Sequence, residues 1–217
     1  MVRAMLIAVL ITIGLQGNAQ TESRITRYNY FFLEAIRQQE MGNLAAAFDL
    51  LNHARDINPK APEVYYEIAG YYVAMQNSKA ARYNFEQAAK LAPDNSTYLE
   101  KLGQFYISQN NYEDALTTYE QLYTSNKTRE DVLQILYQLY GAQNNYKKMI
   151  EMIERMELLS GASEQLSLTK MQIYEQMGDK RKAQAELLRL VQKNPLELNY
   201  RVMLGNWLLQ NNKKKEA

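Results

Sequence analysis

Residues 62–95, PEVYYEIAGYYVAMQNSKAARYNFEQAAKLAPDN, contain two short amphipathic segments in a row. Apolar side chains recur at helical spacing in each segment, which predicts two helices that each bury one face. The first buried stripe contains Tyr65, Ile68, Ala69 and Tyr72. The second contains Ala81, Phe85, Ala88 and Leu91. Polar residues lie between the two stripes, and Pro93 follows the second, so a turn is predicted within the pair and a stop at its end.

The pattern of residues 62–95 recurs every 34 residues. Five whole repeats and a sixth, shorter one account for residues 28–217, and they begin at Tyr28, Pro62, Ser96, Glu130, Glu164 and Leu198. Small residues occupy the eighth place of four repeats: Ala35, Ala69, Gly103 and Gly205. Alanine recurs at the twentieth place: Ala47, Ala81, Ala115, Ala183 and Ala217. Small side chains let two helices approach closely, so the two helices of each repeat are predicted to pack against each other as a pair.

Fixed places also mark where the predicted helices begin and end. The sixteenth place, directly before each second helix, carries Asn43, Asn77, Asn111, Asn145 or Asp179. A side-chain oxygen at this place can accept a hydrogen bond from a free backbone N–H of the helix, which stabilises the helix by about 1 kcal/mol. The thirty-second place carries Pro59, Pro93 or Pro195. Because proline disfavours a helical residue before it, the second helix of these repeats is predicted to stop there.

These residues resemble the tetratricopeptide repeat, a family in which large apolar residues, Gly, Tyr, Ala and Pro recur over 34 residues. The resemblance covers residues 28–217. It implies an all-α fold, a right-handed superhelical solenoid of antiparallel helix pairs, in which the first helix of each pair lines a concave groove. It also implies a scaffold or adaptor that binds other proteins. The related pentatricopeptide RNA-binding proteins have a slightly longer period and are basic, and this chain has neither property.

The composition excludes several kinds of site. The chain has no cysteine and one histidine, His53, which excludes a disulfide framework, a thiol nucleophile and a metal site built from Cys or from Cys and His. Residues 20–217 carry 24 basic and 24 acidic side chains, because one further basic residue is Arg3. A neutral balance argues against a general nucleic-acid-binding protein, whose affinity depends on neutralising phosphates. We therefore expect a protein or peptide partner, and no nucleic acid, metal or cofactor.

Residues suited to catalysis are sparse. Ser160 and Ser163 have no second histidine that could activate them, and His53 is predicted to be an exposed residue on a helix. The glycines are isolated, and none has the spacing of a phosphate-binding loop. The sequence therefore predicts that the protein is not an enzyme.

The start of the chain predicts export. Arg3 precedes an apolar run over residues 4–15, and a site rich in small residues ends at Ala19. The run is shorter than the ~20 residues that a membrane-spanning helix needs, and the pattern is typical of a signal peptide. Residues 1–19 are predicted to be this signal peptide and residues 20–27 a short lead-in, with no stable membrane span in the mature chain. An uncleaved membrane anchor is the alternative.

The two ends of the repeat array depart from the pattern. Glu34 and Gln38 occupy the seventh and eleventh places, which are apolar in most later repeats, and a polar outer face suits a terminal repeat that must stay soluble. The array is therefore expected to begin at Tyr28. The sixth repeat stops at Ala217, near the start of its second helix, so we expect the sequence to be the front portion of a longer protein.

The fifth and ninth places of each first helix are expected to face the groove. Apolar candidates for partner binding lie at the start of the array: Phe32, Ile36 and Tyr66. Amide candidates follow at the ninth place: Gln104, Gln138, Gln172 and Asn206. Amides carry donors and acceptors, so they can bind the backbone of an extended segment, while the apolar side chains hold an apolar anchor. The alternative is a solvated polar face, with a first helix rotated so that Phe32 and Ile36 are hidden.

A groove for acidic tails is not expected. Family members that bind acidic C-terminal tails use clustered Lys, Arg and Asn side chains near these places, and here only Lys101 stands among them. The favoured function is an exported, periplasmic or envelope-associated interaction scaffold that binds a peptide or partner protein in its groove. The second hypothesis is a sensory or regulatory repeat module of a larger signalling protein, with an output domain beyond residue 217.

Overall fold

The computed structural model describes residues 22–215, and all regular elements in this range are helices. The predicted signal peptide, residues 1–19, lies outside the described residues, as does Ala217. Residues 22–27 of the predicted lead-in are helical and continue into the first helix of the first repeat, which spans residues 22–40.

The chain divides into two compact blocks, and the division falls between Phe105 and Tyr106. The N-terminal block contains the helix of residues 22–40 and then α2 (Leu44–Ile57), α3 (Pro62–Ala74), α4 (Ser78–Leu91) and most of α5 (Ser96–Ser108). The C-terminal block contains the end of α5, α6 (Tyr112–Ser125), α7 (Glu130–Ala142), α8 (Tyr146–Ser160), α9 (Glu164–Gln176), α10 (Lys180–Lys193) and α11 (Leu198–Gln210).

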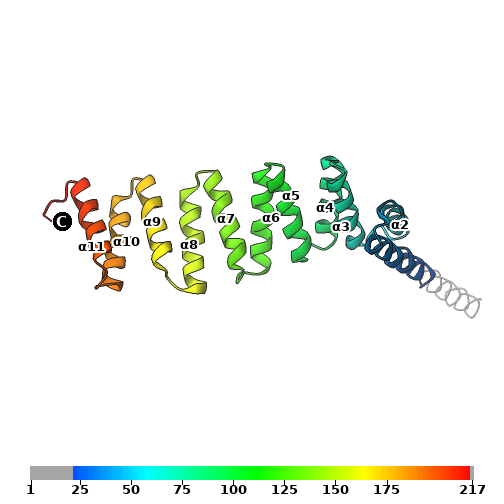
Figure 1. Ribbon diagram of the computed structural model, residues 1–217, viewed down its shortest axis with the longest axis horizontal. Helices are drawn as coiled ribbons and strands as arrows, with labels where there is room; N and C mark the ends of the chain where they lie inside the picture. Colours follow the sequence, from blue (N-terminus) through cyan, green and yellow to red (C-terminus); the bar gives the residue numbers. More distant parts are fainter. Residues whose placement is uncertain (1–21, 216–217) are drawn as a thin grey trace, which may run out of the picture. The chain divides into compact units, whose positions relative to one another are not determined.

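Within each block, consecutive helices pack side by side as antiparallel neighbours (Figure 1). The first helices of five repeats begin at the first place of the repeat and are each 13 residues long. The second helices begin at the seventeenth place, from Leu44 in α2 to Lys180 in α10. The all-α architecture of antiparallel 34-residue helix pairs is therefore confirmed, whereas the right hand of the superhelix stays a prediction.

The core of each block comes from the same places of successive repeats. The alanines at the twentieth place are fully buried: Ala47, Ala81, Ala115 and Ala183. Large side chains at the twenty-fourth place are at most 7% exposed: Leu51, Phe85, Tyr119, Ile153 and Leu187. These two places are one helical turn apart, so each second helix presents a single apolar stripe to its neighbours.

The first helix of each repeat is followed by the same turn, which in the first five repeats leads into the second helix. The residue at the fifteenth place of the repeat has a left-handed backbone, with φ from 54° to 81°. These residues are Gly42, Gln76, Asn110, Asn144, Gly178 and Asn212. The backbone N–H at the sixteenth place donates a hydrogen bond to the carbonyl at the eleventh place of the same repeat. In the second repeat this bond runs from Asn77 to Tyr72 and is 2.9 Å long. This hydrogen bond closes the first helix and satisfies one of its free carbonyls. Glycine and asparagine tolerate the left-handed region best, and they fill five of the six turns.

The predicted caps form in four of the five repeats. The side chains of Asn77, Asn111, Asn145 and Asp179 accept a hydrogen bond from a backbone N–H in the first turn of the following helix. The prediction is wrong for Asn43, which makes no such bond at the start of α2. Its amide nitrogen donates instead to Oε1 of Gln38 at 2.7 Å. The competing partner belongs to the first repeat alone, since a tyrosine or leucine stands at the place of Gln38 in later repeats.

The predicted prolines do mark the ends of second helices. Helix α2 ends two residues before Pro59, α4 two residues before Pro93, and α10 two residues before Pro195. In the fourth repeat, which lacks the proline, α8 ends at Ser160, directly before Gly161, which has a φ of 87°. A left-handed glycine and a proline thus stop the helix by different means.

The polar residues predicted at the outer face of the first repeat form a hydrogen-bonded group. Gln38 donates to the Glu34 carboxylate at 2.7 Å, and the Arg37 guanidinium donates to both of its oxygens. These donors lower the pKa of Glu34 to about 2, with the hydrogen bond from Arg37 as the largest cause. The face is therefore polar and internally bonded, as a terminal repeat requires.

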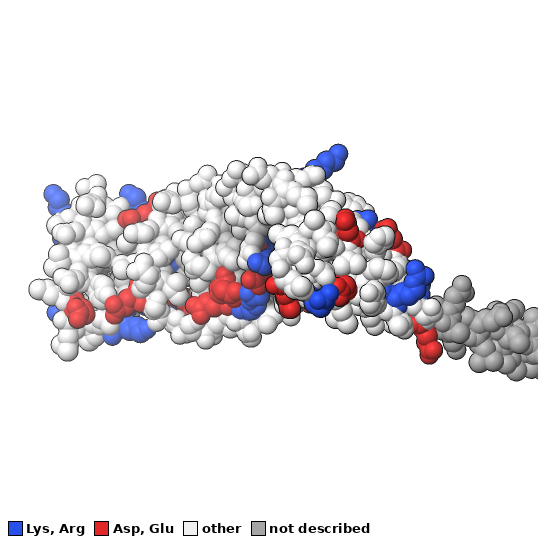
Figure 2. Space-filling model, turned by 45° about the vertical axis from the view of Figure 1, so that its right-hand side comes forward, with Lys and Arg blue, Asp and Glu red and all other residues white. Residues whose placement is uncertain are grey.

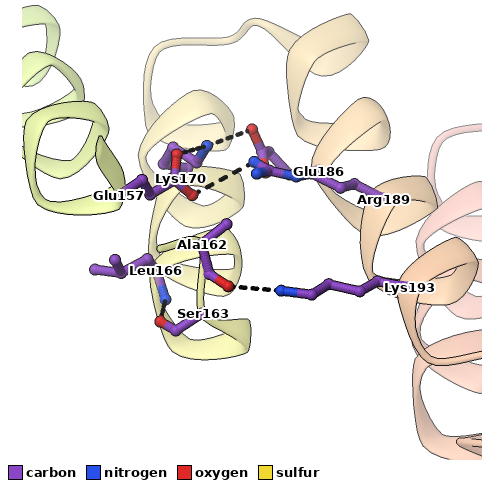
Figure 3. A network of polar contacts seen from close by, with 8 residues as sticks. All are labelled: Glu157, Ala162, Ser163, Leu166, Lys170, Glu186, Arg189 and Lys193. Atoms are coloured by element: carbon purple, nitrogen blue, oxygen red, sulfur yellow. Dashed lines mark hydrogen bonds and ion pairs between the residues drawn. The ribbon is translucent and has the colours of Figure 1, made fainter. Parts of the chain in front are cut away.

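The C-terminal block buries a cluster of ions that the sequence pattern did not predict (Figure 3). The Nζ atom of Lys170, whose side chain is 4% exposed, lies 2.9 Å from a carboxylate oxygen of Glu157 and 2.9 Å from one of Glu186. Arg189 lies 3.4 Å from Glu157 and 3.6 Å from Glu186. We call these four residues the α8–α10 ion cluster. It links α8, α9 and α10, and its two positive charges balance its two negative charges.

Two further polar contacts fix the connection between α8 and α9 (Figure 3). Lys193 donates to the carbonyl of Ala162 at 2.6 Å, and the Ser163 hydroxyl accepts a hydrogen bond from the N–H of Leu166 at 3.1 Å. Ser163 therefore caps α9, which gives this serine a structural role.

Candidate functional site

The amide residues predicted for the groove are available for binding. Gln104, Gln138, Gln172 and Asn206 are all exposed. Among the described residues, none of these four side chains has a hydrogen-bond partner, whereas many other polar side chains do. Gln104 lies on α5 in the N-terminal block, and the other three lie on α7, α9 and α11 in the C-terminal block. Their donors and acceptors are therefore open to an external backbone.

The apolar residues predicted for the groove lie partly in the core of the N-terminal block. Phe32 and Ile36 are half-buried, and the ring of Phe32 stacks on Tyr28 with centroids 5.9 Å apart. Tyr66 is also half-buried, and its ring centroid lies 5.1 Å from that of Tyr98 and 6.3 Å from that of Phe85. All three side chains are thus partly open to solvent, and the rings of Phe32 and Tyr66 each pack on other aromatic rings.

A pocket of about 220 Å³ opens on the same block. Its lining residues come from the helix of residues 22–40, the start of α2, and α3: Gln39, Leu44, Glu67, Gly70, Tyr71 and Ala74. Gly70 is exposed, and a Cβ atom added there would meet no other atom within 4 Å. Gly70 occupies the ninth place, where the other repeats carry Ile36, Gln104 or another side chain. The missing side chain therefore opens the pocket. We call it the Gly70 pocket.

Glu67 is the only charged residue that lines the Gly70 pocket. Burial raises the pKa of its carboxyl group, and a hydrogen bond from Gln39 opposes this effect. The Tyr71 hydroxyl in turn donates to Oε1 of Gln39 at 3.2 Å. Among the described residues, no Lys or Arg forms an ion pair with Glu67. The pocket thus contains a desolvated carboxyl group without a cation.

A second carboxylate lies on the same helix, one turn before Glu67. Glu63 accepts a hydrogen bond from the Tyr28 hydroxyl at 2.5 Å. Burial raises the pKa of Tyr98, and the negative charges of Glu63 and Glu67 raise it further. The charge of Glu67 also raises the pKa of Tyr71, after burial as the largest cause, so Tyr71 in the pocket wall and Tyr98 both experience the negative potential of this carboxylate.

The described residues show little that could support catalysis or metal binding. No group of three or more His, Asp and Glu side chains among them is placed to hold a metal ion. His53 is exposed, and its ring lies 5.6 Å from that of Phe31. The Ser160 hydroxyl donates to Glu130 at 2.5 Å. His53 and Ser160 thus both contact side chains of neighbouring helices.

The charge of one face and the hydropathy of the helices bear on nucleic-acid binding and on membrane crossing. Figure 2 shows acidic and basic side chains interspersed on one face, with large uncharged areas between them. Such a face lacks the concentrated positive charge that nucleic-acid binding uses. In the described range, no helix combines the length and the apolar character that crossing a membrane requires.

The sequence did not reveal the Gly70 pocket. Gly70 occupies the ninth place, which the sequence predicts to face the groove, but Glu67 occupies the sixth place, for which the repeat pattern predicts no role. Its partners Gln39 and Tyr71 come from two helices, so their convergence depends on how the first two repeats pack.

Comparisons with known proteins agree with this architecture. Residues 66–129 match the family model for the tetratricopeptide repeat. A tetratricopeptide repeat protein from Parabacteroides merdae is 16% identical over 88% of this chain and 76% of its own, with a TM-score of 0.57. The MamA protein is 12% identical over 88% of this chain and 97% of its own, with a TM-score of 0.55. At such identities the likeness shows the fold.

A third solved structure is described as having a peptide-binding site. YrrB, a tetratricopeptide repeat protein with an unusual peptide-binding site, is 14% identical over 80% of this chain and 89% of its own, with a TM-score of 0.55. The comparison with curated proteins gave no match.

Proposed function

Because the chain is a tetratricopeptide repeat protein, we propose that it is an interaction scaffold that holds an extended segment of a partner protein against its first helices. The observation that carries the proposal is the set of exposed amides at the ninth place in the C-terminal block, Gln138, Gln172 and Asn206, whose side chains make no hydrogen bond within the described residues. The peptide-binding site described for YrrB supports this assignment by analogy of fold. Proteins of this repeat family are generally scaffolds, and we propose no catalytic role.

We further propose that the scaffold is exported and works in the periplasm or at the cell envelope. The support is the sequence of residues 1–19, which has the pattern of a signal peptide. Mass spectrometry of the protein from a cell-envelope fraction tests this proposal. A chain that begins at Gln20 is the expected result, and an intact Met1 in the cytoplasmic fraction contradicts it.

The amides of the C-terminal block provide a direct test of groove binding. Replacing Gln138 and Gln172 together by alanine is expected to weaken partner binding by about 0.5 to 1.5 kcal/mol for each lost hydrogen bond. Binding should depend weakly on salt, because few ion pairs involve these residues. Isothermal titration calorimetry with a partner identified by crosslinking measures both effects. Replacing Gln104 alone tests the N-terminal block in the same way.

The matched control is Gln192→Ala, which removes an exposed amide from the second helix α10. This variant should bind the partner as tightly as the unaltered protein. If the double variant at Gln138 and Gln172 also binds with unchanged affinity, the amides do not hold the partner, and the proposed mode of binding is wrong.

A further inference from the structure

We propose that the Gly70 pocket binds a basic side chain, lysine or arginine, of the partner segment, with the cation on Glu67. Its aliphatic stem then lies against the apolar part of the pocket wall, Leu44, Tyr71 and Ala74. The inference rests on the proposed function, since it names the kind of residue that the groove accepts from its partner.

The space for this side chain lies at the second repeat. Gly70 leaves its place on α3 open, and a Cβ atom there would have no neighbour within 4 Å. Leu44 at the rim is 55% exposed. An aliphatic stem of several methylene groups can cover this apolar surface while its charged end reaches a polar group, as long basic side chains commonly do.

The charge of the pocket selects a cation. Glu67 is half-buried, its pKa is raised by burial, and it forms no ion pair among the described residues. An apolar occupant would desolvate the carboxyl group further without compensation, and an anion would be repelled by it. A cation supplies the missing partner.

The aromatic wall favours the same chemistry. Tyr71 lines the pocket, and its hydroxyl is directed to Gln39, which also binds Glu67. A cation near an aromatic face is attracted by the negative potential of the ring. Gln39 and Tyr71 therefore hold the carboxyl group in place and offer a second attractive surface to an ammonium or guanidinium group.

The experiment uses capped alanine pentapeptides as probes, with a central lysine, arginine or norleucine. Each peptide is titrated into the full-length, ¹⁵N-labelled protein, and the shifts of the Gly70 and Tyr71 amide signals are followed by NMR. We expect the two basic peptides to shift these signals and to bind about three- to tenfold more tightly than the norleucine peptide, which keeps the stem without the charge.

Two variants locate the interaction. Glu67→Gln should weaken the binding of the basic peptides about three- to tenfold and leave the binding of the norleucine peptide unchanged. The control Glu113→Gln removes an exposed carboxylate from α6 and should change the binding of none of the peptides. Gly70→Leu should abolish the shift of the Tyr71 amide signal with all three peptides, because the leucine side chain fills the pocket. This variant is expected to fold, since leucine favours the helix more than glycine does and the site is open.

The possible outcomes separate this inference from the proposed function. If the norleucine peptide binds as tightly as the basic peptides, the groove accepts a segment but the charge selection is wrong. If no peptide shifts the Gly70 signal, the inference is also overturned, and the crosslinked partner then decides independently whether the protein is a scaffold. Weaker binding of the basic peptides by Glu67→Gln and loss of the shifts in Gly70→Leu, with the Glu113 variant unaffected, support the inference.

Discussion

Replacing Lys170 by methionine is expected to lower the free energy of unfolding of the C-terminal block by about 3 to 5 kcal/mol. The side chains of Glu157 and Glu186 are only 12% and 13% exposed. Without Lys170 they keep Arg189 as a cation, but Arg189 is 43% exposed and more distant. Two desolvated carboxylates would then share one weaker partner. Chemical denaturation followed by circular dichroism measures the loss.

Two further variants identify the cause of this loss. Replacing Lys170 by methionine and both glutamates by leucine should recover most of the stability, because an apolar set of similar size carries no uncompensated charge. Lys147→Met removes an exposed lysine from α8 and should change the free energy of unfolding by less than about 0.5 kcal/mol. If Lys170→Met costs no more than this control, the α8–α10 ion cluster does not stabilise the fold.

Replacing Leu187 by alanine should cost about 2 to 5 kcal/mol of unfolding free energy. Leu187 is fully buried in α10 and belongs to the core cluster of the C-terminal block, together with Ile153, Tyr174 and Trp207. Removing most of its side chain leaves a cavity that rigid neighbouring helices cannot fill completely. Thermal and chemical denaturation both measure this change.

The adjacent residue provides the matched control. Leu188 is 39% exposed on the same helix, so Leu188→Ala removes the same atoms without opening a buried cavity and should cost under about 1 kcal/mol. Native-state hydrogen exchange adds a second readout, because repeat proteins are stabilised mainly by neighbouring repeats. The amides of α9 to α11 should lose protection in the Leu187 variant. Equal costs for the two substitutions would show that the twenty-fourth place is not a core position.

The sequence predicted the helices well because the period encodes them several times. Five first helices begin at the first place of their repeats, and four of the five predicted caps form. Asn43 shows the limit of the pattern. Asn43 can cap α2 only if its side-chain oxygen points to the helix. Its amide nitrogen instead donates to Gln38, and glutamine occurs at that place in the first repeat only.

The polar interior was harder to predict. Lys170 stands at the seventh place of its repeat, where Ile68, Leu102 and Leu136 are buried in other repeats, so the mismatch was visible in the sequence. Its partners were not, because Glu157 and Glu186 come from two other helices. The same holds for the Gly70 pocket. A periodic pattern predicts which places are buried, but the meeting of single side chains from three helices depends on three-dimensional packing.

The α8–α10 ion cluster also bears on how similar repeats are kept in their correct order during folding. A chain of near-identical helix pairs can misassemble by pairing a helix with the wrong neighbour, a characteristic failure of repeat proteins. If α9 docked in the place of α7, Lys170 would face Met152 where it now faces Glu186. An uncompensated buried ammonium group is far more costly than a misplaced leucine. The cluster therefore favours the native pairing of α9 with α8 and α10 over pairing with the helices of another repeat.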